Sequence, residues 1–270
     1  MRKIKTKLIY PIFLKQIGCP NRCIYCNQFL SDTIYNEIGE WEKDGLVFDR
    51  DALINFINKN QNKDKEIAFY GGSFTCLPKA EILAIFNQFK PVVDIKTFFR
   101  LSTRPDAINP EILAILKENK VSTIELGIQS FSDKALFESK RGYDRITAIE
   151  ACKSIVDYGF NLTIQFLIGL PGDDMNSHEE NIKTFINLKP DYIRLYPLLV
   201  LKDTELEILY NHGDYVPLTV DEAVEICKKY YNASIENNIK VIKIGLHTDI
   251  SDGYIIAGPY HKNIGELVRK

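Results

Sequence analysis

The sequence has no apolar run of about 18 residues, the length that a membrane-spanning helix needs, so we expect no transmembrane helix. Its N-terminus has no apolar segment like that of a signal peptide, and we therefore expect a cytoplasmic protein. It also has no internal repeat and no linker rich in Gly, Ser or Pro. These absences favour a single domain over residues 1–270, in which residues 240–270 form a last strand and a closing segment.

An excess of basic residues is missing too. The chain has 34 Lys and Arg residues against 36 Asp and Glu residues, a formal net charge of −2. This balance argues against a protein that binds nucleic acid mainly through its overall charge. Arg2, Lys3, Lys5 and Lys7 form a local basic cluster at the N-terminus, which we interpret as a solvated charged end.

Short β-rich apolar runs alternate with longer segments of helical period. The expected strands are Leu8–Leu14, Glu66–Tyr70, Phe98–Thr103, Thr123–Ile128, Asn161–Ile168, Tyr192–Tyr196 and Lys240–Leu246. The expected helices are Arg50–Asn60, Lys79–Phe89, Pro110–Asn119, Arg145–Tyr158, His178–Leu188 and Val220–Asn237. This alternation is typical of βαβ units with parallel strands.

Six βα units are fewer than the eight of a complete TIM barrel. A doubly wound open sheet would produce the same alternation, so the pattern alone leaves both arrangements open. The segment Ser31–Leu46 is polar and aperiodic, and we expect it to form a loop over one end of the barrel.

Three of the six cysteines lie close together with the spacing C-x3-C-x2-C: Cys19, Cys23 and Cys26. In a cytosolic protein such a cluster indicates metal ligands or redox groups rather than disulfides. Three thiolates can hold three irons of a [4Fe–4S] cluster and leave one iron open, as a catalytic metal site requires. The alternative is a zinc site completed by a distant His, Cys, Asp or Asn side chain.

Other unusual residues follow the ends of the expected strands, where parallel α/β folds bind their ligands. They are the segments Tyr70–Thr75, Ser102–Asp106, Gly127–Phe131 and Gly169–Asp173. Gly71 and Gly72 let the backbone approach a ligand closely, and hydroxyl groups follow them. A tight turn without a function would have the same two glycines, but the cysteine loop one βα unit earlier favours a ligand-binding loop.

The segment Gly18–Cys26 resembles the cluster loop of the radical S-adenosylmethionine (SAM) superfamily. Tyr70–Thr75 resembles the GGE-type motif of that superfamily, with Ser73 where an acidic residue often stands. Ser102–Asp106 and Glu125–Phe131 are similar to the branch that holds the radical SAM domain of the Elongator catalytic subunit and the oxygen-independent coproporphyrinogen III oxidase-like proteins. The resemblance covers nearly the whole chain.

This resemblance implies an α/β fold, a partial TIM-type (βα)6 barrel with parallel strands. It implies an enzyme in which Cys19, Cys23 and Cys26 bind a [4Fe–4S] cluster and SAM chelates the fourth iron. One electron from the reduced cluster then cleaves SAM to methionine and a 5′-deoxyadenosyl radical, which abstracts hydrogen from an unidentified substrate. An electron donor such as flavodoxin or ferredoxin would supply that electron.

The resemblance also implies which residues bind SAM. By position they are Gly71, Gly72, Ser73, Ser102, Thr103, Gln129, Arg141, Gln165 and Ile168. Arg141 matches a basic residue that can pair with the SAM carboxylate, and Ile168 begins a segment that would line the adenine pocket. Gln165 replaces an acidic residue of the coproporphyrinogen oxidases, and its amide can still bind ribose hydroxyls.

The substrate stays open. Modification of tRNA is implied by the Elongator branch, although the chain shows no acetyltransferase half and no basic balance. Coproporphyrinogen oxidation or haem transfer is implied by the other relatives, although neither a matching C-terminal domain nor a haem-ligand motif is visible. A non-catalytic iron–sulfur protein for electron transfer or sensing would not need the SAM-binding motifs, and a zinc-stabilised binding module explains still fewer of them.

The remaining cysteines and two histidines have simpler interpretations. Cys152 and Cys227 fall among apolar residues of expected helices, which predicts buried, unreactive thiols. Cys76 follows the Gly-Gly motif; we favour a packed thiol over a radical relay or a further cluster ligand. His247 and His261 either approach the barrel end or are structural.

Overall fold

A computed structural model of the chain describes residues 7–14, 18–27, 46–246 and 252–270. In this part the strands are β1 (Leu8–Leu14), β2 (Leu46–Val47), β3 (Lys65–Tyr70), β4 (Thr97–Thr103), β5 (Val121–Gln129), β6 (Asn161–Ile168), β7 (Tyr192–Pro197), β8 (Val200–Leu201), β9 (Lys240–Ile244) and β10 (Ile255–Ala257). The helices are α2 (Arg50–Lys59), α3 (Lys79–Phe89), α4 (Pro110–Glu118), α5 (Asp133–Glu138), α6 (Arg145–Asp157), α7 (Met175–Leu188), α8 (Glu205–His212), α9 (Val220–Glu236) and α10 (Ile264–Arg269), with 3₁₀ turns η1 (Phe74–Cys76), η2 (Pro105–Ala107) and η3 (Asp252–Tyr254). Residues 31–45 of the predicted loop Ser31–Leu46 lie outside the described residues, and so does His247.

Every expected strand and helix is present, with small shifts at the ends. Helix α7 begins at Met175 rather than at His178, because Asp174 and Ser177 form a reciprocal capping box before the apolar residues start. The sequence pattern missed α5, α8 and α10, which are too short to show a clear helical period.

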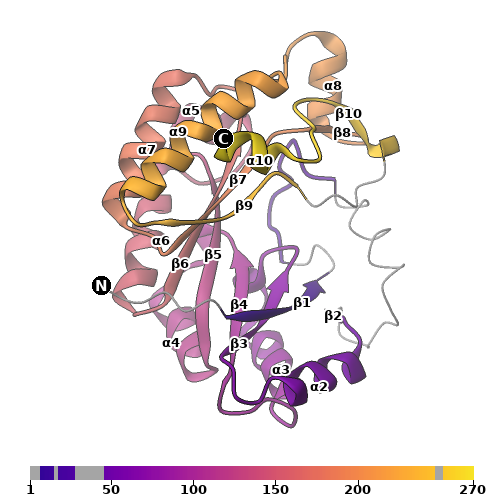
Figure 1. Cartoon of the computed structure of the whole chain (residues 1–270), viewed down its shortest axis with the longest axis vertical. Coiled ribbons are helices and arrows are strands. Elements are labelled where there is room, and N and C mark those ends of the chain that lie inside the picture. The colour runs from indigo at the N-terminus through magenta and orange to yellow at the C-terminus, as the bar shows by residue number, and fades with distance from the viewer. Residues whose placement is uncertain (1–6, 15–17, 28–45, 247–251) are drawn as a thin grey trace. The chain divides into compact units, whose positions relative to one another are not determined.

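The chain divides into two compact units. The first contains residues 1–20, 28–126 and 154–161, and the second contains residues 21–27, 127–153 and 162–270. In the first unit β1, β3, β4 and β5 are parallel neighbours in that order, and β2 pairs antiparallel with β1 (Figure 1). In the second unit β6, β7 and β9 are parallel neighbours, while β8 and β10 form an antiparallel pair. The predicted class, a partial TIM-type (βα)6 barrel with parallel strands, is confirmed.

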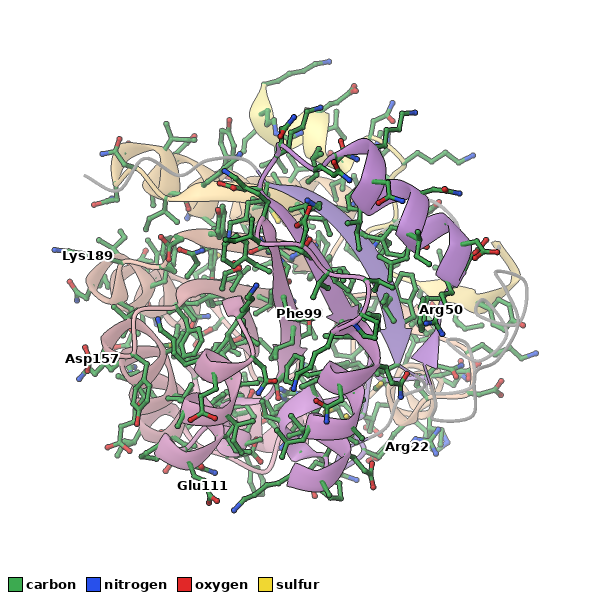
Figure 2. The ribbon with its side chains drawn as sticks, turned by 90° about the horizontal axis from the view of Figure 1, so that it is seen from below. Arg22, Arg50, Phe99, Glu111, Asp157 and Lys189 are labelled. Carbon is green, nitrogen blue, oxygen red and sulfur yellow. The ribbon has the colours of Figure 1, made fainter. Side chains whose placement is uncertain are left out.

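An aromatic cluster forms the core of the first unit. Phe69 on β3 contacts four other phenylalanines with ring centroids 5.0 to 6.2 Å apart: Phe74, Phe86, Phe89 and Phe99. All five rings are buried, and Figure 2 shows Phe99 inside the ribbon while Glu111 lies at its edge. Burying one such ring contributes about 2–3 kcal/mol. The cluster therefore anchors β3, whose end leads into the Gly-Gly motif.

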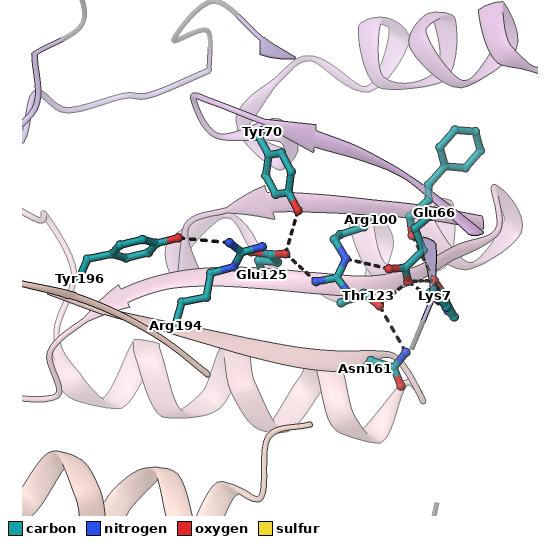
Figure 3. A network of polar contacts seen from close by, with 11 residues as sticks. Lys7, Glu66, Tyr70, Arg100, Thr123, Glu125, Asn161, Arg194 and Tyr196 are labelled. Atoms are coloured by element: carbon teal, nitrogen blue, oxygen red, sulfur yellow. Dashed lines mark hydrogen bonds and ion pairs between the residues drawn. The ribbon is translucent and has the colours of Figure 1, made fainter. Parts of the chain in front are cut away.

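A buried ion network crosses three strands of the same unit (Figure 3). Arg100 on β4 donates to Glu66 on β3 over 2.8 Å and to Glu125 on β5 over 2.6 Å. Glu66 also accepts from the ammonium group of Lys7 at 3.0 Å and from the Thr123 hydroxyl at 2.6 Å. Burial alone would raise the pKa of Glu66, but the charges of Arg100 and Lys7 hold it below 4.5. The prediction of a solvated basic end is therefore wrong for Lys7.

The second unit has its own aromatic core between β6 and helices α7 and α9. Phe166 contacts Phe131, Phe185 and Tyr230 with centroids 5.2 to 5.9 Å apart. Cys152 and Cys227 are fully buried in α6 and α9, as predicted, and burial raises the pKa of the Cys227 thiol to about 12. Within the described residues, no helix combines the length and the apolar character that crossing a membrane requires.

Replacing Arg100 with Met should lower the free energy of unfolding by about 3–5 kcal/mol, because Glu66 and Glu125 would stay buried without their shared cation. Urea unfolding followed by circular dichroism at neutral pH measures this loss. Lys96→Met is the matched control: its 3.4 Å pair with Asp64 is partly exposed, so its removal should change the stability by about 0.5 kcal/mol or less. Equal losses in the two variants would contradict the role given to the buried network.

Candidate functional site

The cysteine loop follows β1 and passes from the first unit into the second between Pro20 and Asn21. Gly18 has a φ of +83°, and a Cβ at this position would lie 2.4 Å from the Ser73 carbonyl oxygen. Only glycine permits that conformation and that approach at once. Next to it, the Cys19 sulfur lies 3.5 Å from the Ser73 hydroxyl oxygen. The structure therefore brings Cys19 against the Gly-Gly motif.

The two glycines of that motif also adopt left-handed backbone conformations. Gly71 has a φ of +84° and Gly72 a φ of +56°. A Cβ at Gly71 would meet the carbonyl oxygen of Leu14, the last residue of β1, at 2.4 Å. Ser73 follows in extended conformation and is 1% exposed. These residues form a tight loop whose conformation requires glycine at positions 71 and 72, because glycine has no side chain.

The turn η1 and the end of β4 are joined by a buried hydroxyl pair. The Thr75 and Thr103 hydroxyl oxygens lie 2.6 Å apart, and the Thr75 backbone N–H also donates to Thr103 at 3.4 Å. Ser102 precedes Thr103 on β4 and is half-buried. Since successive residues of a strand point to opposite faces, Ser102 and Thr103 cannot both face one ligand through their side chains. The first unit thus gathers Cys19, the Gly-Gly motif and the end of β4.

Arg141 binds several polar groups of the second unit. Its guanidinium donates to the Cys23 sulfur at 3.1 Å, to the Tyr25 hydroxyl at 3.1 Å and to the Gly127 carbonyl at 2.6 Å. The Tyr143 hydroxyl accepts from its Nε at 2.9 Å. Arg141 is 5% exposed, so it is a buried arginine. These contacts place a permanent positive charge at one sulfur of the cysteine motif.

The cysteine motif itself is turned and partly enclosed. The Cys26 N–H donates to the Cys23 carbonyl at 3.1 Å, while Cys23 is buried and Cys26 is half-buried. Burial raises the pKa of Tyr25 well above its usual value, although Arg141 acts in the opposite direction. The Tyr25 phenol is therefore neutral near pH 7. The sequence analysis gave no role to Tyr25 or Tyr143. The one feature of the sequence that could have suggested a role is that they stand two residues after Cys23 and Arg141.

Gln129 ends β5 with a φ of +70°, which is unusual for a residue with a side chain. The next residues are fixed by Asn181 on α7: its amide donates to the Ser130 hydroxyl at 3.1 Å and accepts from the Phe131 N–H at 2.6 Å. Such strain persists only where the surroundings enforce it, and it is frequent at functional sites. Nothing in the sequence around Asn181 predicted that its side chain would hold Ser130 and Phe131 in place.

Gln165 and Ile168 lie on opposite faces of β6. Gln165 is half-buried, whereas Ile168 is 1% exposed and shares its face with Phe166, which packs against α7 and α9. If Ile168 borders a ligand, it does so through its backbone.

In the loop after β6, burial raises the pKa of Asp173 to about 6, although Ser177 and Ser130 donate hydrogen bonds that lower it.

The residues fit a [4Fe–4S] cluster by their donor chemistry. Cys19, Cys23 and Cys26 lie on one short loop and none of them is in a disulfide, and the Arg141 guanidinium binds the Cys23 sulfur. Thiolates are the usual ligands of such clusters, and nearby cations favour the thiolate form. Among the described residues no three His, Cys, Asp or Glu side chains are already gathered as a metal site. The ligand assignment therefore stays a prediction.

Comparison with protein families identifies the chain. Residues 14–185 match the model of the radical SAM superfamily, and residues 190–270 match the model of a radical SAM C-terminal domain. An α/β barrel with a cysteine loop after its first strand thus defines the class, and the chain belongs to the radical SAM superfamily. It has the domain of a radical SAM enzyme, a family that uses a [4Fe–4S] cluster and SAM.

Individual relatives agree with this assignment. The tRNA uridine(34) acetyltransferase of Methanocaldococcus jannaschii is 30% identical over 173 residues, which cover 63% of this chain and 31% of that protein. The heme chaperone HemW of Bacillus subtilis is 30% identical over 168 residues, covering 59% and 42%. The structure of Elp3 from Methanocaldococcus infernus is similar with a TM-score of 0.70 at 20% identity, covering 97% of this chain and 61% of that one. The chain thus spans less than half of the first two relatives.

Replacing Gly18 with Ala should move the cysteine loop away from Ser73, because the new methyl group would lie 2.4 Å from a carbonyl oxygen. We expect lower iron uptake during anaerobic reconstitution and a loss of about 2 kcal/mol or more in unfolding free energy. Gly213→Ala is the control, since Gly213 has a similar φ of +82° with nothing within 4 Å of a Cβ. Gly213→Ala should lower the unfolding free energy by about 1 kcal/mol and leave iron uptake unchanged. Equal effects of the two variants on iron uptake would contradict the role of the Gly18 contact.

Proposed function

We propose that Cys19, Cys23 and Cys26 bind three irons of a [4Fe–4S] cluster and that SAM binds the fourth. The observation that carries this proposal is the set of three cysteines on one loop that form no disulfide, with the Arg141 guanidinium 3.1 Å from the Cys23 sulfur. When bound, the cluster and SAM supply a one-electron cleavage that yields methionine and a 5′-deoxyadenosyl radical, which takes hydrogen from a substrate. A flavodoxin or ferredoxin is the proposed electron donor.

The chain's own residues bind and orient SAM in this proposal. Gly71, Gly72 and Ser73 face its methionine part, where left-handed glycines leave backbone N–H groups accessible. Ser102, Thr103 and Gln129 lie near its carboxylate and ribose, although only one of Ser102 and Thr103 can bind SAM through its side chain, and Arg141 pairs with the carboxylate. Gln165 binds ribose hydroxyls, and the backbone of Ile168 borders the adenine. We further propose that both units act as one radical SAM domain over residues 1–270, with residues 240–270 as its closing segment.

For the substrate we propose tRNA. The supporting observation is that a tRNA uridine(34) acetyltransferase is 30% identical over 173 residues of this chain. The formal net charge of −2 means that RNA would be bound by local contacts rather than by overall charge. A cytoplasmic location is part of the same proposal, since tRNA and small electron-transfer proteins are found there.

Cys19→Ala, Cys23→Ala and Cys26→Ala should each lose cluster assembly and SAM cleavage, because a cubane cluster held by two thiolates is poorly retained. The protein is reconstituted anaerobically and reduced with dithionite. Iron, sulfide and the 5′-deoxyadenosine formed from SAM are then quantified, with and without tRNA. Cys152→Ala is the control and should keep the iron, the sulfide and the formation of 5′-deoxyadenosine. Full iron and sulfide in every motif variant would sink the ligand assignment, and a stable cluster indifferent to SAM would favour electron transfer or sensing.

Arg141→Lys should weaken SAM binding about tenfold, because an ammonium group keeps the charge but has too few N–H groups to pair with a carboxylate and also keep the contacts with Cys23, Tyr25 and Gly127. Equilibrium dialysis on reconstituted protein of equal iron content measures the affinity. Arg22→Lys is the control, since exposed Arg22 donates only to the Asp203 carbonyl at 3.3 Å among its described contacts. If Arg141→Lys loses iron but binds SAM normally per cluster, Arg141 acts on Cys23 and not on SAM.

A further inference from the structure

Cys76 differs from the other two cysteines outside the motif. Cys152 and Cys227 are fully buried in helices, whereas Cys76 is half-buried at the end of η1. The interpretation of Cys76 as a packed thiol stays a prediction, since its side chain is packed on one side only. Its side chain borders a cavity of about 660 Å³ that Cys19 also lines, together with Pro20, Lys79, Asn109 and Ile112. Both cysteines therefore line one cavity, and neither is fully buried.

Ser73 contacts both cysteines. Its hydroxyl oxygen lies 3.5 Å from the Cys19 sulfur. The Cys76 N–H donates to the Ser73 carbonyl at 3.0 Å, which closes the turn that carries Cys76. Ser73 thus lies against Cys19 through its side chain and against Cys76 through its backbone.

The loop that carries Cys19 comes close to Cys76. A Cβ at Gly18, the residue before Cys19, would lie 3.4 Å from the Cβ of Cys76. A disulfide needs Cα atoms about 4.4–6.8 Å apart and Cβ atoms about 3.5–4.5 Å apart. The disulfide therefore requires the loop to turn the Cys19 side chain toward Cys76, so that the two Cβ atoms reach this range.

We propose that Cys19 and Cys76 form a disulfide when the cysteine loop holds no cluster and a peroxide is present. The peroxide oxidises the Cys19 thiol to a sulfenic acid and leaves as water. The Cys76 sulfur then attacks the Cys19 sulfur: the S–S bond forms, the S–O bond breaks and a second water leaves with the Cys76 proton. The two thiols together give two electrons to one peroxide molecule, so the reaction is balanced.

The cysteine count gives this disulfide a consequence. Cys23 and Cys26 are separated by two residues and can pair with each other, which leaves Cys19 as the odd thiol of the motif. A bond to Cys76 protects Cys19 from irreversible oxidation and removes one ligand from the site until a thiol reductant restores it. This consequence for cluster assembly rests on the proposed function, whereas the disulfide itself does not.

Peptide mapping of the full chain tests the proposal without any cluster. Metal-free protein is treated with a stoichiometric amount of hydrogen peroxide, its remaining thiols are alkylated after unfolding, and the digest is analysed by mass spectrometry. We expect a cross-linked peptide pair that joins Cys19 to Cys76, lighter than the sum of its parts by two hydrogen atoms. Cys152 and Cys227 should be alkylated. Iron uptake should be lost after peroxide and return after dithiothreitol.

Two variants separate this disulfide from other reactions of the loop. Cys76→Ser should abolish the cross-link and leave Cys19 open to sulfinic acid formation, while circular dichroism shows whether the fold is kept. Cys152→Ser should leave the cross-link unchanged. The proposal is overturned if Cys19 is found joined to Cys23 or Cys26, or if the Cys19–Cys76 peptide is absent from folded wild-type protein. Failure of iron uptake in untreated protein would instead count against the proposed function, and the peptide map would still decide whether the disulfide forms.

Discussion

Two close backbone approaches hold the cysteine loop against the Gly-Gly motif, and the first unit's part of the site depends on them. Gly18 meets the Ser73 carbonyl, and Gly71 meets the carbonyl of Leu14 at the end of β1. Each contact would be blocked by a single methyl group, and each glycine has a positive φ. Because β1 and β3 are parallel neighbours, their ends lie side by side, and the two contacts fasten one loop to the other.

Two buried arginines serve different purposes in the two units. Arg100 lies between Glu66 and Glu125, so it joins three strands through opposite charges and holds the pKa of Glu66 low. Arg141 binds a backbone carbonyl, tyrosine hydroxyls and the Cys23 sulfur. The first arrangement stabilises a strand framework, whereas the second places a cation at the Cys23 thiol, where a positive charge favours the thiolate form. Burial of a charge is costly in both cases, and dense hydrogen bonding offsets it.

The family assignment fixes the cofactor chemistry more firmly than the substrate. The chain matches the radical SAM model over residues 14–185, yet it spans 31% of the tRNA uridine(34) acetyltransferase and 42% of the heme chaperone that it resembles. One fold hosts many substrates, because specificity lies in loops and added segments around a common core. The shared core therefore explains cluster and SAM binding, and the substrate has to be found by experiment.

The sequence alone determined the βα alternation, the position of the cysteine loop and the strand-end motifs, because hydrophobic period and turn residues are local properties. It also predicted the burial of Cys152 and Cys227 correctly. It could not show that Lys7 pairs with Glu66, that Asn181 fixes the residues after Gln129, or that Cys19 lies against Ser73 and lines the same cavity as Cys76. Those partners are separated by about 50 residues or more, and only the tertiary structure brings them together, since parallel strands place distant segments at the same sheet edge.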